Sequence, residues 1–478
     1  MELINKLILN INDFLWTYIL IAMLIVSGIY FTFKTKFVQF TNIKEMFKLL
    51  GEGSSKEHEH SVSSFQAFCI STASRVGTGN LAGIATALAI GGPGAIFWMW
   101  LIALIGASSS FIESTLAQIY KVKDGNSFRG GPAYYMEKGL KKRWMGVLFA
   151  ILITITFGLV FNSVQANTIT LALNESFGFN RSVLGIILTL LTVIIIFGGV
   201  NRIANVSSIL VPIMAVAYIA VALFIVIINF SELPGVFKMI FDNAFGLNQV
   251  IGGSLGAALL QSIKKGLFSN PVLLQGVKRG LFSNEAGMGS APNAAATATV
   301  SHPVKQGLIQ TLGVFTDTII ICSCTAFIIL LSGVPLDGSV KGIQLTQMAL
   351  TSQLGPFGGI FVSICILLFA FSSIVGNYYY GEANISFITD KKIYVLVYRL
   401  AVGLMVFFGS LVSMDIVWNL ADVFMGLMAI INLIAILLLG KIAFKALADY
   451  NKQRKEGKDP IFKSSSIPEL GDEVEEWK

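Results

Sequence analysis

The chain has 478 residues, of which 54% are hydrophobic and 13% charged, with a mean hydropathy of +0.74. These values exclude a soluble globular protein, and the recurrence of apolar runs near twenty residues predicts a polytopic protein of the lipid bilayer. The net charge of +7 does not indicate a nucleic-acid partner, because Lys and Arg lie mainly between the apolar runs and in the C-terminal tail, where they set membrane orientation.

Apolar runs bounded by charged or turn residues predict an all-α protein with about eleven transmembrane helices. Their approximate limits are 14–33, 65–90, 93–120, 145–173, 182–200, 206–230, 271–300, 304–332, 355–388, 393–413 and 416–440. The stretch 235–270 is expected to form amphipathic helical pieces that lie on the outer surface or re-enter the membrane. The tail from Lys441 is expected to be loosely ordered.

Basic residues predict the orientation of the chain in the membrane. The loops 33–64 and 121–144 carry five and seven Lys/Arg, and the tail from Lys441 carries eight. Because cytoplasmic segments are enriched in Lys and Arg, we expect a multi-pass protein of the cell membrane with its N-terminus outside and its C-terminus in the cytoplasm. Four basic residues before and near the start of the seventh span depart from this pattern, and no reason for them can be read from the sequence: Lys264, Lys265, Lys278 and Arg279.

The second apolar run contains a helix-breaking motif. Val76-Gly77-Thr78-Gly79-Asn80 places two glycines one residue apart near the middle of 65–90. A helix that stops and restarts there frees amides and carbonyls at membrane depth, which is tolerable only where they line a polar cavity. The binding site is therefore expected around this break.

An internal repeat indicates the architecture. A shift of 210 residues lays Gly77-Thr78-Gly79-Asn80 on Gly287-Met288-Gly289-Ser290 and Pro93 on Pro303, and it also superimposes the limits of the later spans. Because each copy holds an odd number of helices, the second copy enters the membrane from the opposite side, which gives a 5+5 inverted repeat preceded by one extra helix.

The repeat divides the chain into five parts. They are an N-terminal helix with a cytoplasmic loop (1–64), a first five-helix repeat (65–230), an outer amphipathic connector (231–270), a second five-helix repeat (271–440) and a cytoplasmic tail (441–478).

Inverted five-helix repeats with broken first helices resemble the leucine-transporter type of secondary transporter. The segment 91–100, Gly-Gly-Pro-Gly-Ala-Ile-Phe-Trp-Met-Trp, resembles the signature of the alanine or glycine:cation symporter family. The segments 74–80, 282–292 and 379–382 resemble further blocks of that family in the same order. The resemblance covers roughly 65–390. It implies no enzyme, but a symporter that takes up a small neutral amino acid with sodium by alternating access.

The two breaks are expected to hold the amino acid. Half-helix N-termini present amides to a carboxylate, and half-helix C-termini present carbonyls to an ammonium group. The substrate candidates at the first break are Thr78 and Gly79, with Asn80 close by, and at the second break they are Asn284, Gly287, Met288 and Gly289. Alternatively, the glycines merely permit close helix packing. The family resemblance adds Gln165 to the pocket, with an interhelical hydrogen bond as its alternative role.

The same resemblance implies a sodium site. Its ligands would be the hydroxyls of Ser372 and Ser373 and the carbonyls of Ala73, Val76 and Phe369. Serines in a membrane helix more often bond back to their own helix, which is the alternative reading.

One residue departs from the family pattern. The family commonly has a tryptophan after the glycine that precedes Tyr-Tyr-Gly-Glu, whereas this chain has Gly376-Asn377. Replacing an indole by a short amide enlarges the pocket and makes its wall hydrogen-bonding. We therefore expect Asn377 to admit a longer polar side chain such as that of glutamine, besides alanine and glycine.

Charges within spans need partners. Arg75 is expected to pair with Glu285 or Glu113, either as a gate or as a fixed ion pair, and Glu382 and Asp422 are expected at a membrane face.

Two rival functions remain open. Gly252-Gly253-Ser254-Leu255-Gly256 fits the G-x-S-x-G pattern of a serine hydrolase, but the histidines, His58, His60 and His302, are all expected on the other side of the membrane. A proton-coupled amino-acid transporter is the closer rival. It would be expected to place a titratable group at the cation site, where this chain has two serines.

Overall fold

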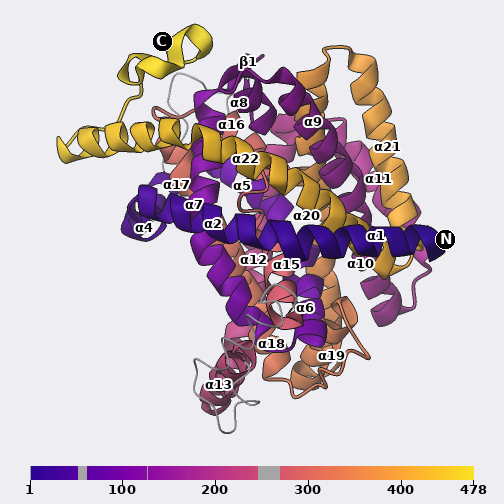
Figure 1. Cartoon of the computed structure of the whole chain (residues 1–478). Helices are drawn as coiled ribbons and strands as arrows, with labels where there is room; N and C mark the ends of the chain where they lie inside the picture. Colours follow the sequence, from indigo (N-terminus) through magenta and orange to yellow (C-terminus); the bar gives the residue numbers. More distant parts are fainter. Residues whose placement is uncertain (1, 52–61, 126, 246–269, 478) are drawn as a thin grey trace.

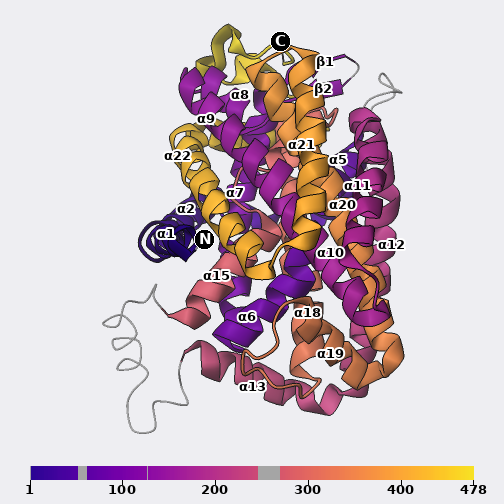
Figure 2. The same cartoon turned by 90° about the vertical axis from the view of Figure 1, so that its right-hand side faces the viewer.

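The computed structural model describes residues 2–51, 62–125, 127–245 and 270–477, and this part of the chain is almost entirely helical (Figures 1 and 2). The motif 252–256, the connector beyond Phe245, His58, His60, Lys264 and Lys265 lie outside the described residues. The expectations made for them stay predictions.

The N-terminal part and the first repeat comprise the following elements. They are α1 (Glu2–Phe14), η1 (Leu15–Leu20), α2 (Ile21–Lys34), α3 (Val38–Thr41), α4 (Ile43–Leu50), α5 (Ser64–Arg75), η2 (Gly79–Gly83), α6 (Ile84–Gly91), α7 (Ala95–Ile119), the hairpin strands β1 (Val122–Asp124) and β2 (Ser127–Arg129), α8 (Pro132–Lys138), α9 (Arg143–Ile153), η3 (Thr154–Phe161), α10 (Asn162–Phe177), α11 (Arg181–Ile196) and α12 (Gly199–Ile228).

The part of the described chain that follows α12 contains the remaining elements. It comprises η4 (Phe230–Glu232), α13 (Leu233–Ala244), α15 (Pro271–Asn284), α16 (Ala291–Thr297), α17 (Pro303–Val314), η7 (Phe315–Cys322), α18 (Ser323–Leu330), α19 (Ile343–Leu354), α20 (Pro356–Ile388), α21 (Lys392–Leu411), α22 (Met414–Lys455), η8 (Ser464–Ser466) and η9 (Pro468–Glu473). The elements η1, η2, η3 and η7 are π-helical stretches.

The helices agree with the predicted spans. Within the described residues, eight helices are long and apolar enough to cross a membrane. The shorter α11 and the two broken helices account for the other predicted spans, so that the fold is consistent with eleven. The last helix was expected to end near residue 440 but continues to Lys455. Charge from Lys441 onward marks the end of the apolar run and not of the helix, which stops before Gly457, a residue with φ of +73°.

The two broken helices run antiparallel, as an inverted repeat requires. The N-terminal half of the first, α5, packs on α16, and its C-terminal half, α6, packs on α15. At one end the Thr299 amide donates to the Val62 carbonyl at 3.2 Å, which joins the start of the first broken helix to the end of the second. At the other end, a Cβ on Gly91 would lie 3.0 Å from the Gln275 Cβ, so this glycine allows close contact.

The unexplained basic pair has an internal partner. Arg279 lies 2.9 Å and Lys278 lies 3.8 Å from the same Asp422 carboxylate oxygen, and all three side chains are buried. The Arg279 guanidinium also lies 4.5 Å from the centre of the Trp418 ring. The expectation that Asp422 lies at a membrane face is therefore wrong, because it ties α15 to α22 inside the protein.

The C-terminal tail is packed rather than loosely ordered. Phe462, Ile467, Leu470, Val474 and Trp477 are all buried. The Trp477 indole nitrogen donates to the Gln118 carbonyl at 3.0 Å, at the end of α7. The expectation of a loosely ordered tail was wrong. It rested on the many charged residues of this segment, but the five apolar residues between them pack against the rest of the protein.

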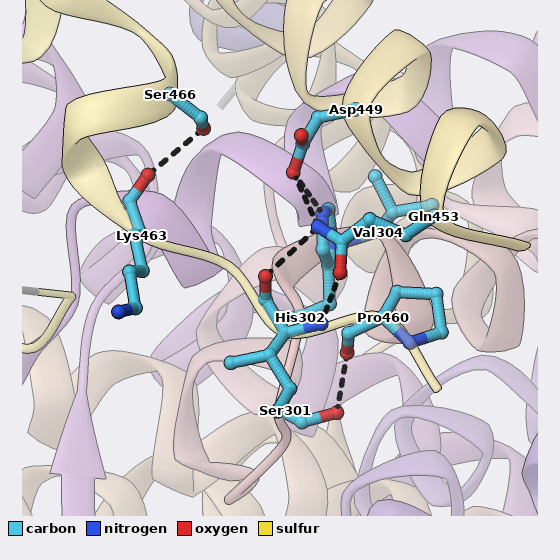
Figure 3. A network of polar contacts seen from close by, with 9 residues as sticks. Ser301, His302, Val304, Asp449, Gln453, Pro460, Lys463 and Ser466 are labelled. Atoms are coloured by element: carbon cyan, nitrogen blue, oxygen red, sulfur yellow. Dashed lines mark hydrogen bonds and ion pairs between the residues drawn. The ribbon is translucent and has the colours of Figure 1, made fainter. Parts of the chain in front are cut away.

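A polar network fixes the tail to the start of α17 (Figure 3). The Phe462 amide donates to the Ser301 carbonyl at 2.9 Å, and the Ser301 hydroxyl donates to the Pro460 carbonyl at 2.9 Å. Burial lowers the pKa of His302 to about 3, so the ring is neutral at physiological pH. Its Nδ1 accepts from the Val304 amide at 3.2 Å, which leaves the proton on Nε2, 3.4 Å from the Asp449 carboxylate. The start of α17 is therefore bound to the tail through Ser301 and to α22 through His302.

Replacing Trp477 by alanine should release the tail. Loss of the buried indole removes its packing and its hydrogen bond, so trypsin should cleave after Lys458 and Lys463 at least about tenfold faster than in the wild-type protein. Cleavage is followed by mass spectrometry of the detergent-solubilised protein. Glu475→Ala is the matched control, because it removes only the exposed ion pair with Lys138. Equal cleavage rates in the two variants would show that Trp477 does not hold the tail.

Candidate functional site

Both predicted helix breaks are confirmed. The first helix ends at Arg75, Val76 has φ −80° and ψ 89°, and the chain becomes helical again at Gly79. The second helix ends at Asn284 and restarts at Ala291. Between them Glu285, Gly287 and Gly289 have φ of 57°, 81° and 87°, values that glycine adopts without strain and that a glutamate rarely adopts.

At the first break, side-chain oxygens accept hydrogen bonds from the freed backbone amides. The Gln165 side-chain oxygen accepts from the Thr78 amide at 2.9 Å and from the Thr78 hydroxyl at 2.7 Å. The Asn80 side-chain oxygen accepts from the Gly77 amide at 2.9 Å. The structure thus brings Thr78, Asn80 and Gln165 together, and the Gln165 oxygen lies where a carboxylate oxygen of an amino acid would accept the same two hydrogen bonds.

At the second break, a buried carboxylate accepts hydrogen bonds from the freed backbone amides. Glu113 of α7 accepts from the Gly287 amide at 3.2 Å, the Gly289 amide at 3.1 Å and the Asn432 side chain at 2.7 Å. The two glycine amides therefore already serve an internal anion. A substrate role for Gly287, Met288 and Gly289 stays a prediction, and it would fall to their carbonyls or require Glu113 to move.

A serine links the two breaks near Asn377. The Ser74 hydroxyl lies 2.7 Å from a Glu285 oxygen and 2.7 Å from the Asn377 side-chain oxygen, while Ser290 donates to the other Glu285 oxygen at 2.5 Å. A hydroxyl carries one proton, so Ser74 donates to only one of its two neighbours. The Asn377 amide therefore keeps one polar atom free, and its side-chain nitrogen is buried without a partner, as is that of Asn284.

The predicted sodium ligands converge. The Ser373 hydroxyl lies 2.8 Å from the Ala73 carbonyl, 3.4 Å from the Val76 carbonyl and 3.0 Å from the Phe369 carbonyl. Of these three carbonyls, the Ser372 hydroxyl contacts only that of Phe369, to which it donates at 2.8 Å. All five residues are buried.

The chemistry of this group fits sodium. Its donors are carbonyl and hydroxyl oxygens, the hard neutral ligands suited to a small monovalent cation, and they belong to the first break and to α20. The space beside them depends on a glycine, because a Cβ on Gly77 would lie 2.2 Å from the Ser373 hydroxyl oxygen.

A second carboxylate supports the first break. Asp317 of η7 is fully buried and accepts from Asn80 at 2.6 Å, from Ser283 at 2.7 Å and from Thr318 at 2.8 Å. Like Glu113, it is recognisable in the sequence as an acid within a span. Two of its partners, Asn80 and Ser283, are not recognisable in the sequence, because they come from other helices.

The expected pairing of Arg75 is not formed among the described residues. The buried guanidinium donates to the Gln310 carbonyl at 3.2 Å and to the Ser110 hydroxyl at 3.4 Å. An ion-pair gate with Glu285 or Glu113 is therefore not the arrangement of this conformation.

Comparison with known proteins gives a consistent result. The model of the sodium:alanine symporter family matches residues 1–272 and 270–464. The probable sodium/glutamine symporter GlnT of Bacillus subtilis is 58% identical over 94% of this chain and 91% of its own length. The amino-acid carrier protein AlsT of the same organism is 54% identical over 99% and 98%. The sodium/alanine symporter AgcS of Methanococcus maripaludis is 36% identical over 94% and 98%.

The fold also resembles a solved structure. The crystal structure of MhsT in complex with L-phenylalanine matches with a TM-score of 0.57 at 18% identity, and covers 83% of this chain and 96% of that protein. At this identity the match concerns the fold alone.

Proposed function

The chain belongs to the sodium:alanine symporter family, and we propose that it accumulates glutamine, together with smaller neutral amino acids, by coupling their entry to sodium. It is a sodium-coupled amino-acid symporter and not an enzyme. Substrate choice, the binding residues and the orientation of the termini are proposals. Cytoplasmic placement of the basic segments, with the N-terminus outside, follows from the distribution of Lys and Arg.

The pairing of Thr78 with Gln165 carries the proposal for the carboxylate. The Thr78 amide and hydroxyl point at one acceptor oxygen, which is the arrangement that a carboxylate oxygen needs. We place the substrate carboxylate at this position, next to Gly79 and to the sodium ligands. The Gln165 side chain then has to move away from Thr78 when the substrate binds. Without substrate, its oxygen accepts the two hydrogen bonds that the substrate carboxylate would accept.

Asn377 supports glutamine as a substrate. Its amide keeps a buried polar atom without a partner, close to Ser74 at the first break. A side-chain amide can satisfy that atom, whereas the methyl group of alanine cannot. The name of the related GlnT agrees with this choice, and the names of AgcS and of the family agree with alanine as a further substrate.

The general test is sodium-driven uptake into proteoliposomes. Labelled glutamine should accumulate under an inward sodium gradient at fixed pH, and the accumulation should disappear when potassium or choline replaces sodium. Unchanged uptake without sodium would favour the proton-coupled alternative. Failure of glutamine to compete with labelled alanine would contradict the proposed substrate.

Replacing Asn377 by tryptophan should shift the substrate preference. The indole fills the space for a long side chain and removes the amide, so the ratio of glutamine to alanine uptake efficiency should fall at least about tenfold. The measurement is kcat/KM for each labelled amino acid in the same proteoliposomes. Ile364→Trp is the matched control, because Ile364 lies on the same helix and is 48% exposed. An unchanged ratio in Asn377→Trp would place the selectivity elsewhere.

A further inference from the structure

A basic pocket lies where the N-terminal helix and the last helix end on the same side. Figure 1 shows α2, α4 and the C-terminal end of α22 meeting at the left edge of the molecule. The pocket between them has a volume of about 910 Å³. Its lining residues are Lys34, Thr35, Lys36, Thr41, Asn42, Phe444, Leu447, Ala448, Asn451, Lys452, Arg454, Lys455 and Glu456.

The positive charge of this pocket is not neutralised within the described part of the protein. Arg454 is paired with Glu45 at 2.9 Å, and Glu456 is paired with Lys458 at 2.8 Å. The remaining cations, Lys34, Lys36, Lys452 and Lys455, form no ion pair with the residues that the structure describes, and all four are exposed. Four unpaired ammonium groups around one pocket attract a multiply hydrogen-bonding anion.

The pocket also has apolar surroundings. Phe444, Leu447 and Ala448 form one wall. The segment 33–47, which also carries Lys34 and Lys36, holds four phenylalanines with large exposed fractions, namely Phe33 65%, Phe37 43%, Phe40 43% and Phe47 61%. On α4, Met46 and Leu49 are buried while Lys44, Phe47 and Lys48 are exposed, so the outer face of this helix combines an aromatic ring with two ammonium groups.

We propose that this pocket binds the headgroup of an anionic phospholipid. The four lysines surround the phosphate, and the acyl chains lie along the exposed phenylalanines. A soluble phosphate compound would need the cations but not the apolar rim, and the pocket lies at Lys34, where an apolar span ends. A bound lipid would join the extra N-terminal helix to α22, the helix that also carries Asn432 at the second break.

Lipid binding is measured by native mass spectrometry on the full-length protein in detergent. The probes are phosphatidylglycerol and phosphatidylcholine with identical acyl chains. We expect phosphatidylglycerol to bind the wild-type protein in preference to phosphatidylcholine. With Lys34→Gln, Lys36→Gln, Lys452→Gln and Lys455→Gln combined, its affinity should fall at least about tenfold.

The control carries the same change in net charge. Lys142→Gln, Lys391→Gln, Lys392→Gln and Lys463→Gln combined remove four exposed lysines that lie outside the pocket, and this variant should bind like the wild type. Replacing the four pocket lysines by arginine should retain binding. If the four-residue glutamine variant does not elute as a folded protein, Lys452→Gln with Lys455→Gln is measured instead.

Three results would overturn the proposal. The pocket variant could bind phosphatidylglycerol as tightly as the wild type, or the control variant could lose the same affinity, which would reduce the effect to overall charge. Glycerol 3-phosphate could displace the lipid at equal concentration, which would identify a soluble anion as the ligand. None of these readouts depends on transport, so the proposal stands or falls separately from the identity of the substrate.

Discussion

Replacing Ser373 by alanine should raise the sodium concentration for half-maximal uptake at least about tenfold. The Ser373 hydroxyl lies within 3.4 Å of the carbonyls of Ala73, Val76 and Phe369, so it lies at the centre of the proposed sodium ligands. The measurement is uptake of labelled glutamine into proteoliposomes as a function of sodium concentration, at constant ionic strength.

Ser372→Ala is the matched control for this experiment. Ser372 is the neighbouring residue on α20, and its hydroxyl donates to a carbonyl of its own helix at 2.8 Å. The sodium requirement should change less in this variant than in Ser373→Ala. If Ser373→Ala leaves the sodium requirement unchanged, the cation does not bind at Ser373, and an equal shift in both variants would assign both hydroxyls to the site. A smaller maximal rate with an unchanged sodium requirement would point to a structural role for the hydroxyl.

Replacing Glu113 by alanine should destabilise the protein by roughly 3 kcal/mol, because two buried backbone amides and one side-chain amide lose their acceptor. These donors are the Gly287 amide, the Gly289 amide and the Asn432 side chain. The measurement is thermal unfolding of the purified protein in detergent, followed by uptake assays on the fraction that remains folded.

Two variants make the result specific to Glu113. Glu113→Gln keeps a single acceptor oxygen and should lose less stability than Glu113→Ala. Glu175→Ala removes an exposed carboxylate that accepts from Gln344 at 3.1 Å, and it should leave unfolding unchanged. Wild-type stability in Glu113→Ala would mean that water satisfies the amides of the second break.

The two helix breaks are supported in a related way. Glu113 belongs to the second span of the first repeat and binds the break of the second repeat. Asp317 belongs to the second span of the second repeat and binds Asn80 at the break of the first. Each repeat therefore supplies a buried carboxylate to the broken helix of the other. The two carboxylates lie on equivalent helices of the two repeats but not at equivalent positions, because a shift of 210 residues places Glu113 on Ser323.

The spans, both breaks and the inverted repeat could be predicted from the amino-acid sequence alone. These features depend on local properties: hydropathy along one segment predicts a span, and glycines one residue apart predict an interrupted helix whatever surrounds it. Family resemblance implied five sodium ligands, which stay a prediction; the structure places three of them, the carbonyls of Ala73, Val76 and Phe369, within 3.4 Å of the Ser373 hydroxyl.

The groups that satisfy the atoms freed by the breaks could not be predicted, because they lie far away in the chain. Gln165 takes the Thr78 amide from 87 residues away, and Glu113 takes the Gly287 amide from 174 residues away. The same is true of Asp422, which neutralises Arg279, and of the tail, which Trp477 fixes to α7. A buried donor or charge requires a partner, but the sequence does not say which one, because the partner is set by how distant helices pack against each other.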